Sequence, residues 1–260
     1  MPDVLNFSSV SFVRNDNQIL KNINFQLEEA DSLVILGRNG AGKTTLINLL
    51  FGYLWPTTGT ISVFGNEYGT TPMAPLQKQM GIVQSNHQET LLQRLTAFEM
   101  VLTGLIGTLG LYADPTVSQI EKAMELLNSM SMGQKKDQNY ASLSSGEKMK
   151  ILLLRALGEG KRLLVLDEPA AALDLTARHE LFESVKVLKT KNPKLTRILI
   201  THRLEEIPTD FGKILLLKNG EVFVSGNKEE VLTDANLSRL YDLNLKVHCN
   251  DGQYSATIQS

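Results

Sequence analysis

The residue pattern with the clearest chemical meaning is a glycine-rich loop that ends in a lysine and a threonine. It follows the apolar run 33–36 and consists of Gly37, Arg38, Asn39, Gly40, Ala41, Gly42, Lys43, Thr44 and Thr45. Glycines let backbone amides come close to phosphate oxygens, and the helix that begins here adds a favourable dipole. We expect Lys43 to reach the β- and γ-phosphates and the Thr44 hydroxyl to ligate Mg²⁺. The loop therefore predicts binding of a nucleoside triphosphate.

Two adjacent acids end a second apolar run. Residues 163–166 are Leu-Leu-Val-Leu, and Asp167 and Glu168 follow them. A buried strand that delivers carboxylates at its C-terminal end is typical of ligand chemistry in an open α/β sheet. We expect Asp167 to hold Mg²⁺ together with Thr44, and Glu168 to orient the water that attacks the γ-phosphate. On its own such a segment is more often a solvated turn, but the phosphate-binding loop favours the catalytic interpretation.

The elements that must position these residues alternate between strands and helices. Short strands are predicted at 4–13, 25–27, 59–64, 81–83, 163–166, 197–200 and 214–217. Helical spacing predominates from about 88 to 157, where one predicted apolar stripe consists of Ile120, Met124, Leu127 and Met130. A later helix is predicted to bury Leu181, Val185 and Leu188 and to stop in the polar segment 189–194. This alternation predicts an α/β fold with a largely parallel sheet flanked by helices.

A third motif connects the chain to a known family. The segment Leu143-Ser144-Ser145-Gly146-Glu147 resembles the L-S-G-G-Q signature of ATP-binding cassette (ABC) ATPases. Other residues follow the order of that family: Gln84 after a strand, Asp174 in an Ala-Leu-Asp segment, and His202 after the strand near residue 200. The similarity extends from about residue 4 to residue 227, and several motifs in the right order are specific. The chain is identified as a member of the ABC ATPase family.

The resemblance implies a P-loop ABC ATPase fold with an N-terminal antiparallel β subdomain and an inserted helical subdomain. It places the ATP-binding domain at 1–232, the helical subdomain at about 88–160 and a short C-terminal extension at 233–260. In this family two cassettes dimerise head to tail, and each ATP lies between the phosphate-binding loop of one chain and the signature of the other. The resemblance therefore implies ATP and Mg²⁺ as cofactors, an integral membrane permease, and a second ABC ATPase chain as partner. That chain is either a second copy of this one, which both half-sites permit, or a different cassette.

Roles for individual residues come from the same resemblance. Glu168, His202 and Gln84 are expected to be catalytic, with His202 on the γ-phosphate and Gln84 on Mg²⁺ or the attacking water. Asp174 belongs to the D-loop. The residues expected to bind the ATP of the partner chain are Ser144, Ser145, Gly146 and Glu147.

The chain also departs from the family pattern. Arg14 stands where an aromatic residue usually stacks on adenine, although a guanidinium plane can stack on a base as well. Ser145 and Glu147 replace a glycine and a glutamine, while Gly146 is kept, so we expect a working but slower site. Residues 137–142 lack the Glu-containing segment typical of exporters, which favours an importer-type or stand-alone cassette. The segment 201–208 is similar to molybdate-type transport ATPases.

Composition excludes several other classes. The formal net charge of -2 does not support a nucleic-acid-coating surface, so no nucleic acid is expected as a partner. The single cysteine, Cys249, excludes an internal disulfide and a multi-cysteine metal site. The N-terminus lacks the pattern of a signal peptide, and the uncharged stretch 100–113 is well short of the roughly 20 residues that a membrane span needs. We expect a cytoplasmic protein, peripheral at the inner face of the cell membrane.

Three functions remain open from the sequence. In the first, the chain is the ATPase subunit of a transporter, and apolar residues of segment 88–113 receive a helix of the permease or form core: Leu91, Leu92, Leu95, Phe98, Val101 and Leu102. In the second, a soluble cassette acts on a ribosome or DNA. The single phosphate-binding loop disfavours this. The third is another P-loop enzyme such as a kinase, which would lack the signature.

Overall fold

The computed structural model describes residues 3–84, 94–107, 114–158 and 160–259. By their contacts these residues form two compact units, Met1–Gln77 with Lys194–Ser260, and Lys78–Pro193. Within the described part of the chain, we find no helix with the length and apolar character needed to cross a membrane.

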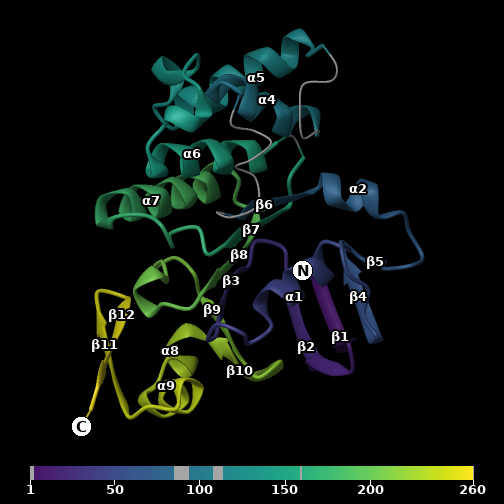
Figure 1. Ribbon diagram of the computed structural model, residues 1–260, viewed down its shortest axis with the longest axis vertical. Helices are drawn as coiled ribbons and strands as arrows, with labels where there is room; N and C mark the ends of the chain where they lie inside the picture. The colour runs from purple at the N-terminus through teal and green to yellow at the C-terminus, as the bar shows by residue number, and fades with distance from the viewer. Residues whose placement is uncertain (1–2, 85–93, 108–113, 159, 260) are drawn as a thin grey trace. The chain divides into compact units, whose positions relative to one another are not determined.

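The first unit begins with an antiparallel sheet, drawn in purple and blue in Figure 1. Its strands are β1 (Asp3–Arg14), β2 (Asn17–Glu28), β4 (Thr58–Val63) and β5 (Asn66–Glu67), in the order β2-β1-β4-β5. Leu5 pairs with Leu27 on one side and with Val63 on the other, and all three side chains are buried. The three predicted N-terminal strands and the antiparallel N-terminal β subdomain are therefore confirmed.

The same unit contains a set of buried parallel strands. β3 (Ser32–Leu36) lies parallel to β8 (Thr196–Thr201) and to β9 (Lys213–Lys218), and β10 (Glu221–Asn227) runs antiparallel to β9. Every residue of β3 and β8 is buried, as expected for strands covered on both faces. α1 (Lys43–Leu50) follows β3 directly across the phosphate-binding loop. The predicted parallel α/β arrangement is confirmed here.

A buried charge lies in β8 of this unit. The Arg197 side chain is 1% exposed; its Nη1 lies 2.8 Å from Asp210 Oδ2, and its Nη2 donates to Ser32 Oγ at 2.7 Å. Burial lowers the pKa of Arg197, and the Asp210 carboxylate opposes that shift. Removing one member of such a pair leaves the other charge desolvated and uncompensated.

We expect Asp210→Asn to lower the free energy of unfolding by about 3 kcal/mol, because Arg197 stays buried without its counter-ion. Chemical denaturation measures this. The matched control is Glu29→Gln, which breaks a pair with the exposed Lys194 (3.6 Å) and should cost less than about 0.5 kcal/mol, because Lys194 stays solvated. Equal costs for the two variants would show that the burial of Arg197 does not matter.

The C-terminal part of the first unit is drawn in yellow-green and yellow in Figure 1. A 3-10 turn, η3 (Leu204–Glu206), follows β8; α8 (Lys228–Val231) and α9 (Asp234–Tyr241) follow β10; and β11 (Leu245–Asn250) and β12 (Gln253–Ile258) form an antiparallel hairpin. Leu237 and Leu240 of α9 are fully buried. The predicted β-containing tail is confirmed, but it also contains a helix that the sequence pattern did not indicate.

The second unit is mostly helical. Its strands β6 (Met80–Gln84) and β7 (Leu163–Asp167) pair in parallel. Its helices are α4 (Ala97–Ile106), α5 (Val117–Ser129), α6 (Ser145–Ala156) and α7 (Leu175–Lys191), with short 3-10 turns η1 (Gly133–Lys135) and η2 (Tyr140–Ser142). The helix α2 (Met73–Lys78) precedes β6. α6 and α7 lie side by side in Figure 1, joined by an ion pair between Lys150 and Glu180 (2.7 Å).

One helical prediction needs correction. Of the predicted α5 stripe, Leu127 and Met130 are buried, but Ile120 is 39% exposed, and Ala123, which the predicted stripe did not include, is buried in the middle of the helix. α7 buries Leu181, Val185 and Leu188 and ends at Lys191, inside the polar segment 189–194 and before Pro193, so both predictions for this helix are confirmed.

Candidate functional site

The phosphate-binding loop lies between β3 and α1 and depends on its glycines. Gly40 and Gly42 have left-handed backbone angles, with φ of 82° and 105°. A Cβ on Gly42 would lie 2.7 Å from the Leu20 side chain, and one on Gly37 would lie 2.5 Å from Leu217 O. Gly42 is also the N-cap of α1 and supplies no side-chain cap to its first turn. Gly37 and Gly42 therefore leave no room for a side chain, and Gly40 and Gly42 have backbone angles that favour glycine.

Lys43 projects into this loop. Its side chain is only 7% exposed, and its ammonium donates hydrogen bonds to Gly37 O (2.8 Å) and to Arg38 O (3.1 Å). The loop carbonyls therefore hold a positive charge inside the turn, next to the start of α1. Thr44 is exposed and Thr45 half-buried in the first turn of this helix. The donor set fits a polyphosphate.

The position predicted to stack on adenine lies at the end of β1. Phe12 is 9% exposed and forms part of the core of the N-terminal sheet, whereas Arg14 is exposed. A register shift in the pairing with β2 falls between Phe12 and Val13. Of these side chains, Arg14 is the one that a base could reach.

The acidic edge of β7 brings two predicted residues together in the second unit. Gln84 is the register partner of Asp167, and its Nε2 donates to Asp167 Oδ2 at 3.1 Å. The remaining oxygens of the pair are ligands of the kind that Mg²⁺ prefers. Glu168 follows with φ of 47°, a left-handed conformation that is costly for a non-glycine residue. This turn directs Glu168 away from the course of the strand, and such strained residues cluster at functional sites.

The signature segment forms the start of α6, which begins at Ser145, directly after Ser144. The reason is a capping box: Ser144 Oγ accepts from Glu147 N (3.3 Å), and Glu147 Oε2 accepts from Ser144 N (3.0 Å). A Cβ on Gly146 would lie 2.9 Å from the Cβ of Ala177, so glycine is favoured there.

The structure also explains why a glutamate is tolerated in the signature. Glu147 forms an ion pair with Lys135, and this contact lowers the pKa of the Glu147 carboxyl below its usual value. The charge therefore has a counter-ion, while the capping hydrogen bond that a glutamine would make is kept.

We expect Glu147→Gln to change the free energy of unfolding by less than about 0.5 kcal/mol at neutral pH, because only the half-exposed ion pair is lost. Glu147→Ala removes the cap as well and should cost about 1 kcal/mol. Because the folded-state pKa is lowered, the ion-pair contribution is present above the ordinary glutamate pKa and disappears as the pH falls through the lowered one. Chemical denaturation of both variants and of wild type, from neutral pH to below the lowered pKa of Glu147, measures this contribution. If the difference in free energy of unfolding between wild type and Glu147→Gln stayed the same at acid pH, the ion pair would not be its cause.

The last two predicted positions follow strands β7 and β8. Asp174 is the N-cap of α7 and accepts from Ala177 N at 2.8 Å. His202 follows β8 and is half-buried. Hydrogen bonds of Thr201 stabilise the loop that contains His202: the Thr201 hydroxyl donates to the buried Glu206 and accepts from Arg203 N at 3.1 Å.

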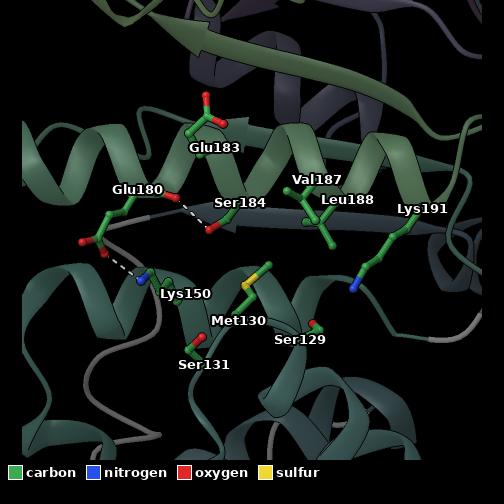
Figure 2. Close-up of a pocket in the computed structure, with 10 residues that line it drawn as sticks. All are labelled: Ser129, Met130, Ser131, Lys150, Glu180, Glu183, Ser184, Val187, Leu188 and Lys191. Carbon is green, nitrogen blue, oxygen red and sulfur yellow. Dashed lines mark hydrogen bonds and ion pairs between the residues drawn. The ribbon is translucent and has the colours of Figure 1, made fainter.

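The predicted site residues are shared between the units. The first unit contains Arg14, the loop 37–45 and His202, and the second contains Gln84, Asp167, Glu168, the segment 144–147 and Asp174. A cavity of about 290 Å³ borders the phosphate-binding loop and is lined by Arg38, Asn39, Gly40, Ala41, Leu217, Lys218, Asn219 and Leu240. Figure 2 shows another cavity of about 290 Å³, between the end of α5, α6 and α7, to which no predicted site residue contributes.

Comparison with known proteins decides the family. The sequence pattern of the ABC transporter family matches residues 20–171, more than half of the chain. This chain belongs to the ABC transporter family. An uncharacterized ABC transporter ATP-binding protein of Bacillus subtilis (strain 168) is 40% identical over 248 residues, which cover 95% of this chain and 94% of the relative. An uncharacterized ABC transporter ATP-binding protein of Lactococcus lactis is 33% identical over 251 residues, which cover 96% of this chain and 97% of the relative.

Solved structures agree with this assignment. An ATP-binding cassette of an ABC transporter superposes with a TM-score of 0.82 at 25% identity, over 93% of this chain and 99% of the other. The chain is therefore an ATP-binding and ATP-hydrolysing ABC protein with the P-loop ABC ATPase fold.

Two contacts of this ABC protein were not indicated by any motif. Tyr241 and Asp242, at the end of α9, reach the backbone of His202 and the side chain of Arg38. No local pattern in the C-terminal extension signals such contacts, because the partners are 39 and 204 residues away in the sequence.

Proposed function

We propose that two copies of this chain clamp two ATP molecules and use their hydrolysis to drive a separate membrane permease. The observation that carries the proposal is that the chain presents two helix N-termini suited to anions. One is α1 behind the phosphate-binding loop, and the other is α6 at the signature. One chain can thus offer its loop to one nucleotide and its signature to another.

In this proposal the phosphate-binding loop and Lys43 bind the β- and γ-phosphates, and Arg14 stacks on the base. Thr44, Gln84 and Asp167 hold Mg²⁺, which neutralises phosphate charge when it is bound. The contact between Gln84 and Asp167 supports this assignment, because it gathers oxygen ligands at the end of β7.

Glu168 is proposed to polarise the attacking water, and His202 to contact the γ-phosphate. Ser144 and the Gly146 amide would bind the γ-phosphate of the partner's nucleotide, with Ser145 and Glu147 alongside and Asp174 in the D-loop. Hydrolysis removes the charge that joins the two surfaces, so the dimer opens. A solved relative of this fold is described as a dimeric post-hydrolysis state bound to ADP and Pi.

The membrane permease is proposed from the relatives. A hemin import ATP-binding protein of Hahella chejuensis is 30% identical over 92% of this chain. Among the predicted docking residues, Leu95 and Phe98 are half-buried and Val101 and Leu102 belong to the core, while Leu91 and Leu92 lie outside the described residues. We therefore assign a docking role to Leu95 and Phe98 only.

We accordingly propose a cytoplasmic protein at the inner face of the membrane, with residues 1–232 as the ATP-binding domain, about 88–160 as its helical subdomain and 233–260 as an extension. The molybdate-type resemblance stays a prediction.

The test combines ATPase assays with affinity purification from membranes. We expect phosphate release that depends on Mg²⁺, and recovery of an integral membrane protein with the tagged chain. The control is Leu95→Glu combined with Phe98→Glu, which should lose the membrane partner but keep ATP binding. Recovery of ribosomes or DNA instead would contradict the transporter assignment.

A further inference from the structure

The end of α9 contacts two loops of the first unit that the proposed function uses. Tyr241, the last residue of the helix, donates a hydrogen bond from its hydroxyl to His202 O at 3.0 Å. Asp242, the next residue, accepts from Arg38 of the phosphate-binding loop, with 3.1 Å between Nη1 and Oδ2. Two consecutive residues therefore join the loop that carries His202 to the loop that binds phosphate.

These two residues are held firmly by α9. Leu237 and Leu240 are fully buried and anchor the helix. Asp242 caps it in a left-handed conformation with φ of 56°, and its N–H donates to Ser238 O. Because the helix end is both packed and capped, the two side chains start from a fixed backbone.

The Tyr241 hydroxyl is suited to a permanent donor role. Burial raises the pKa of Tyr241 to about 12, with a smaller contribution from the negative charge of Glu205. The hydroxyl is therefore protonated throughout the physiological range and can donate to the His202 carbonyl. This carbonyl belongs to the rigid peptide plane that leaves His202, so the contact restrains the direction of the chain at that residue.

Asp242 neutralises a positive charge on the phosphate-binding loop. Its Oδ1 lies 2.6 Å from Lys218 Nζ, and the contacts with Lys218 and Arg38 lower the pKa of Asp242. The carboxylate is therefore ionised at neutral pH. Without it, Arg38 and Lys218 would lose their shared negative partner next to a loop that already holds Lys43.

We propose that Tyr241 and Asp242 form a C-terminal clasp, in which Tyr241 positions His202 for hydrolysis and Asp242 limits the charge that Arg38 presents to the nucleotide. The clasp rests on the proposed role of His202 and of the loop. Both members are positioning residues: Tyr241 affects turnover, and Asp242 affects nucleotide affinity.

The first test is Tyr241→Phe, which removes the hydroxyl and keeps the ring. We expect kcat for ATP hydrolysis to fall about 3- to 10-fold, as for the loss of one hydrogen bond, with KM unchanged within about twofold. The matched control is Tyr254→Phe. Burial also raises the pKa of Tyr254 to about 12, and its hydroxyl contacts Cys249 in the C-terminal hairpin, so a general effect of losing a buried hydroxyl would appear in both variants.

The second test is Asp242→Asn. We expect KM for ATP to fall about two- to fivefold at low ionic strength, and the difference from wild type to vanish in about 0.5 M salt, where exposed charges are screened. The matched control is Asp234→Asn at the other end of α9, which breaks a similar exposed pair with Lys246 (2.8 Å) and should leave KM unchanged.

The outcomes separate the clasp from the proposed function. If wild type hydrolyses ATP and Tyr241→Phe matches Tyr254→Phe in kcat, Tyr241 does not position His202. If Asp242→Asn leaves KM unchanged at low salt, Arg38 is not restrained by Asp242. If wild type itself releases no phosphate, the proposed catalytic role fails first. Melting temperatures confirm that each variant is folded.

Discussion

Lys43→Ala is expected to weaken ATP binding by about 100-fold, the effect of losing a charged hydrogen-bond donor to phosphate. The Lys43 ammonium lies inside the loop, held by Gly37 O and Arg38 O, and is 7% exposed. It is therefore expected to meet the phosphates from a site where solvent screens little. Calorimetric titration of the purified chain with ATP measures the dissociation constant.

The control for this variant is Lys21→Ala. Lys21 lies in the same unit and forms a half-exposed ion pair with Glu221 at 3.3 Å, so its loss removes one positive charge without touching the loop. ATP affinity should stay within about twofold of wild type. If Lys43→Ala also stayed within that range, the loop would not bind phosphate through this ammonium.

Glu168→Gln is expected to keep ATP affinity and to lower kcat by about 100- to 1000-fold, the loss of a general base. The amide has the size and the backbone requirements of the acid, so the left-handed turn at φ of 47° is retained. Bound ATP is then not cleaved, and the proposed dimer should accumulate. Phosphate release and gel filtration with Mg²⁺-ATP measure the two effects.

The matched control is Glu183→Gln on α7, which removes an exposed carboxylate from the second unit. It should turn over at the wild-type rate and should not accumulate dimer. Wild-type turnover by Glu168→Gln would assign the activation of water to another group, and the contact between Gln84 and Asp167 would then be the next region to test.

Much of the fold could be predicted from local patterns. The continuous apolar runs 33–36, 163–166 and 198–200 became buried strand segments, because a strand covered on both faces favours apolar residues at successive positions. The prediction failed where packing decided. Ile120 fits the period of the α5 stripe, yet the buried positions of that helix are Ala123 and Leu127.

For the candidate site, too, local sequence patterns predicted one part and the structure supplied the other. The types and spacing of the residues predicted the phosphate-binding loop, and the structure adds why Gly37 and Gly42 are needed: Leu217 and Leu20 occupy the space of a Cβ at these positions. The sequence also predicted that Gln84 and Asp167 share a task, and their strands bring them within 3.1 Å. Their individual catalytic roles stay predictions.

By itself the sequence determined the chemistry of the chain. Each of its motifs consists of residues that are neighbours in the sequence: the phosphate-binding loop, the signature with its N-cap, and the two acids at the end of a strand. Only the tertiary structure decided which distant groups support that chemistry. Lys135 neutralises Glu147, Tyr241 restrains His202, and Asp242 holds Arg38. Such contacts depend on where separate elements bring side chains together, and side-chain type at one position does not encode the position of its partner.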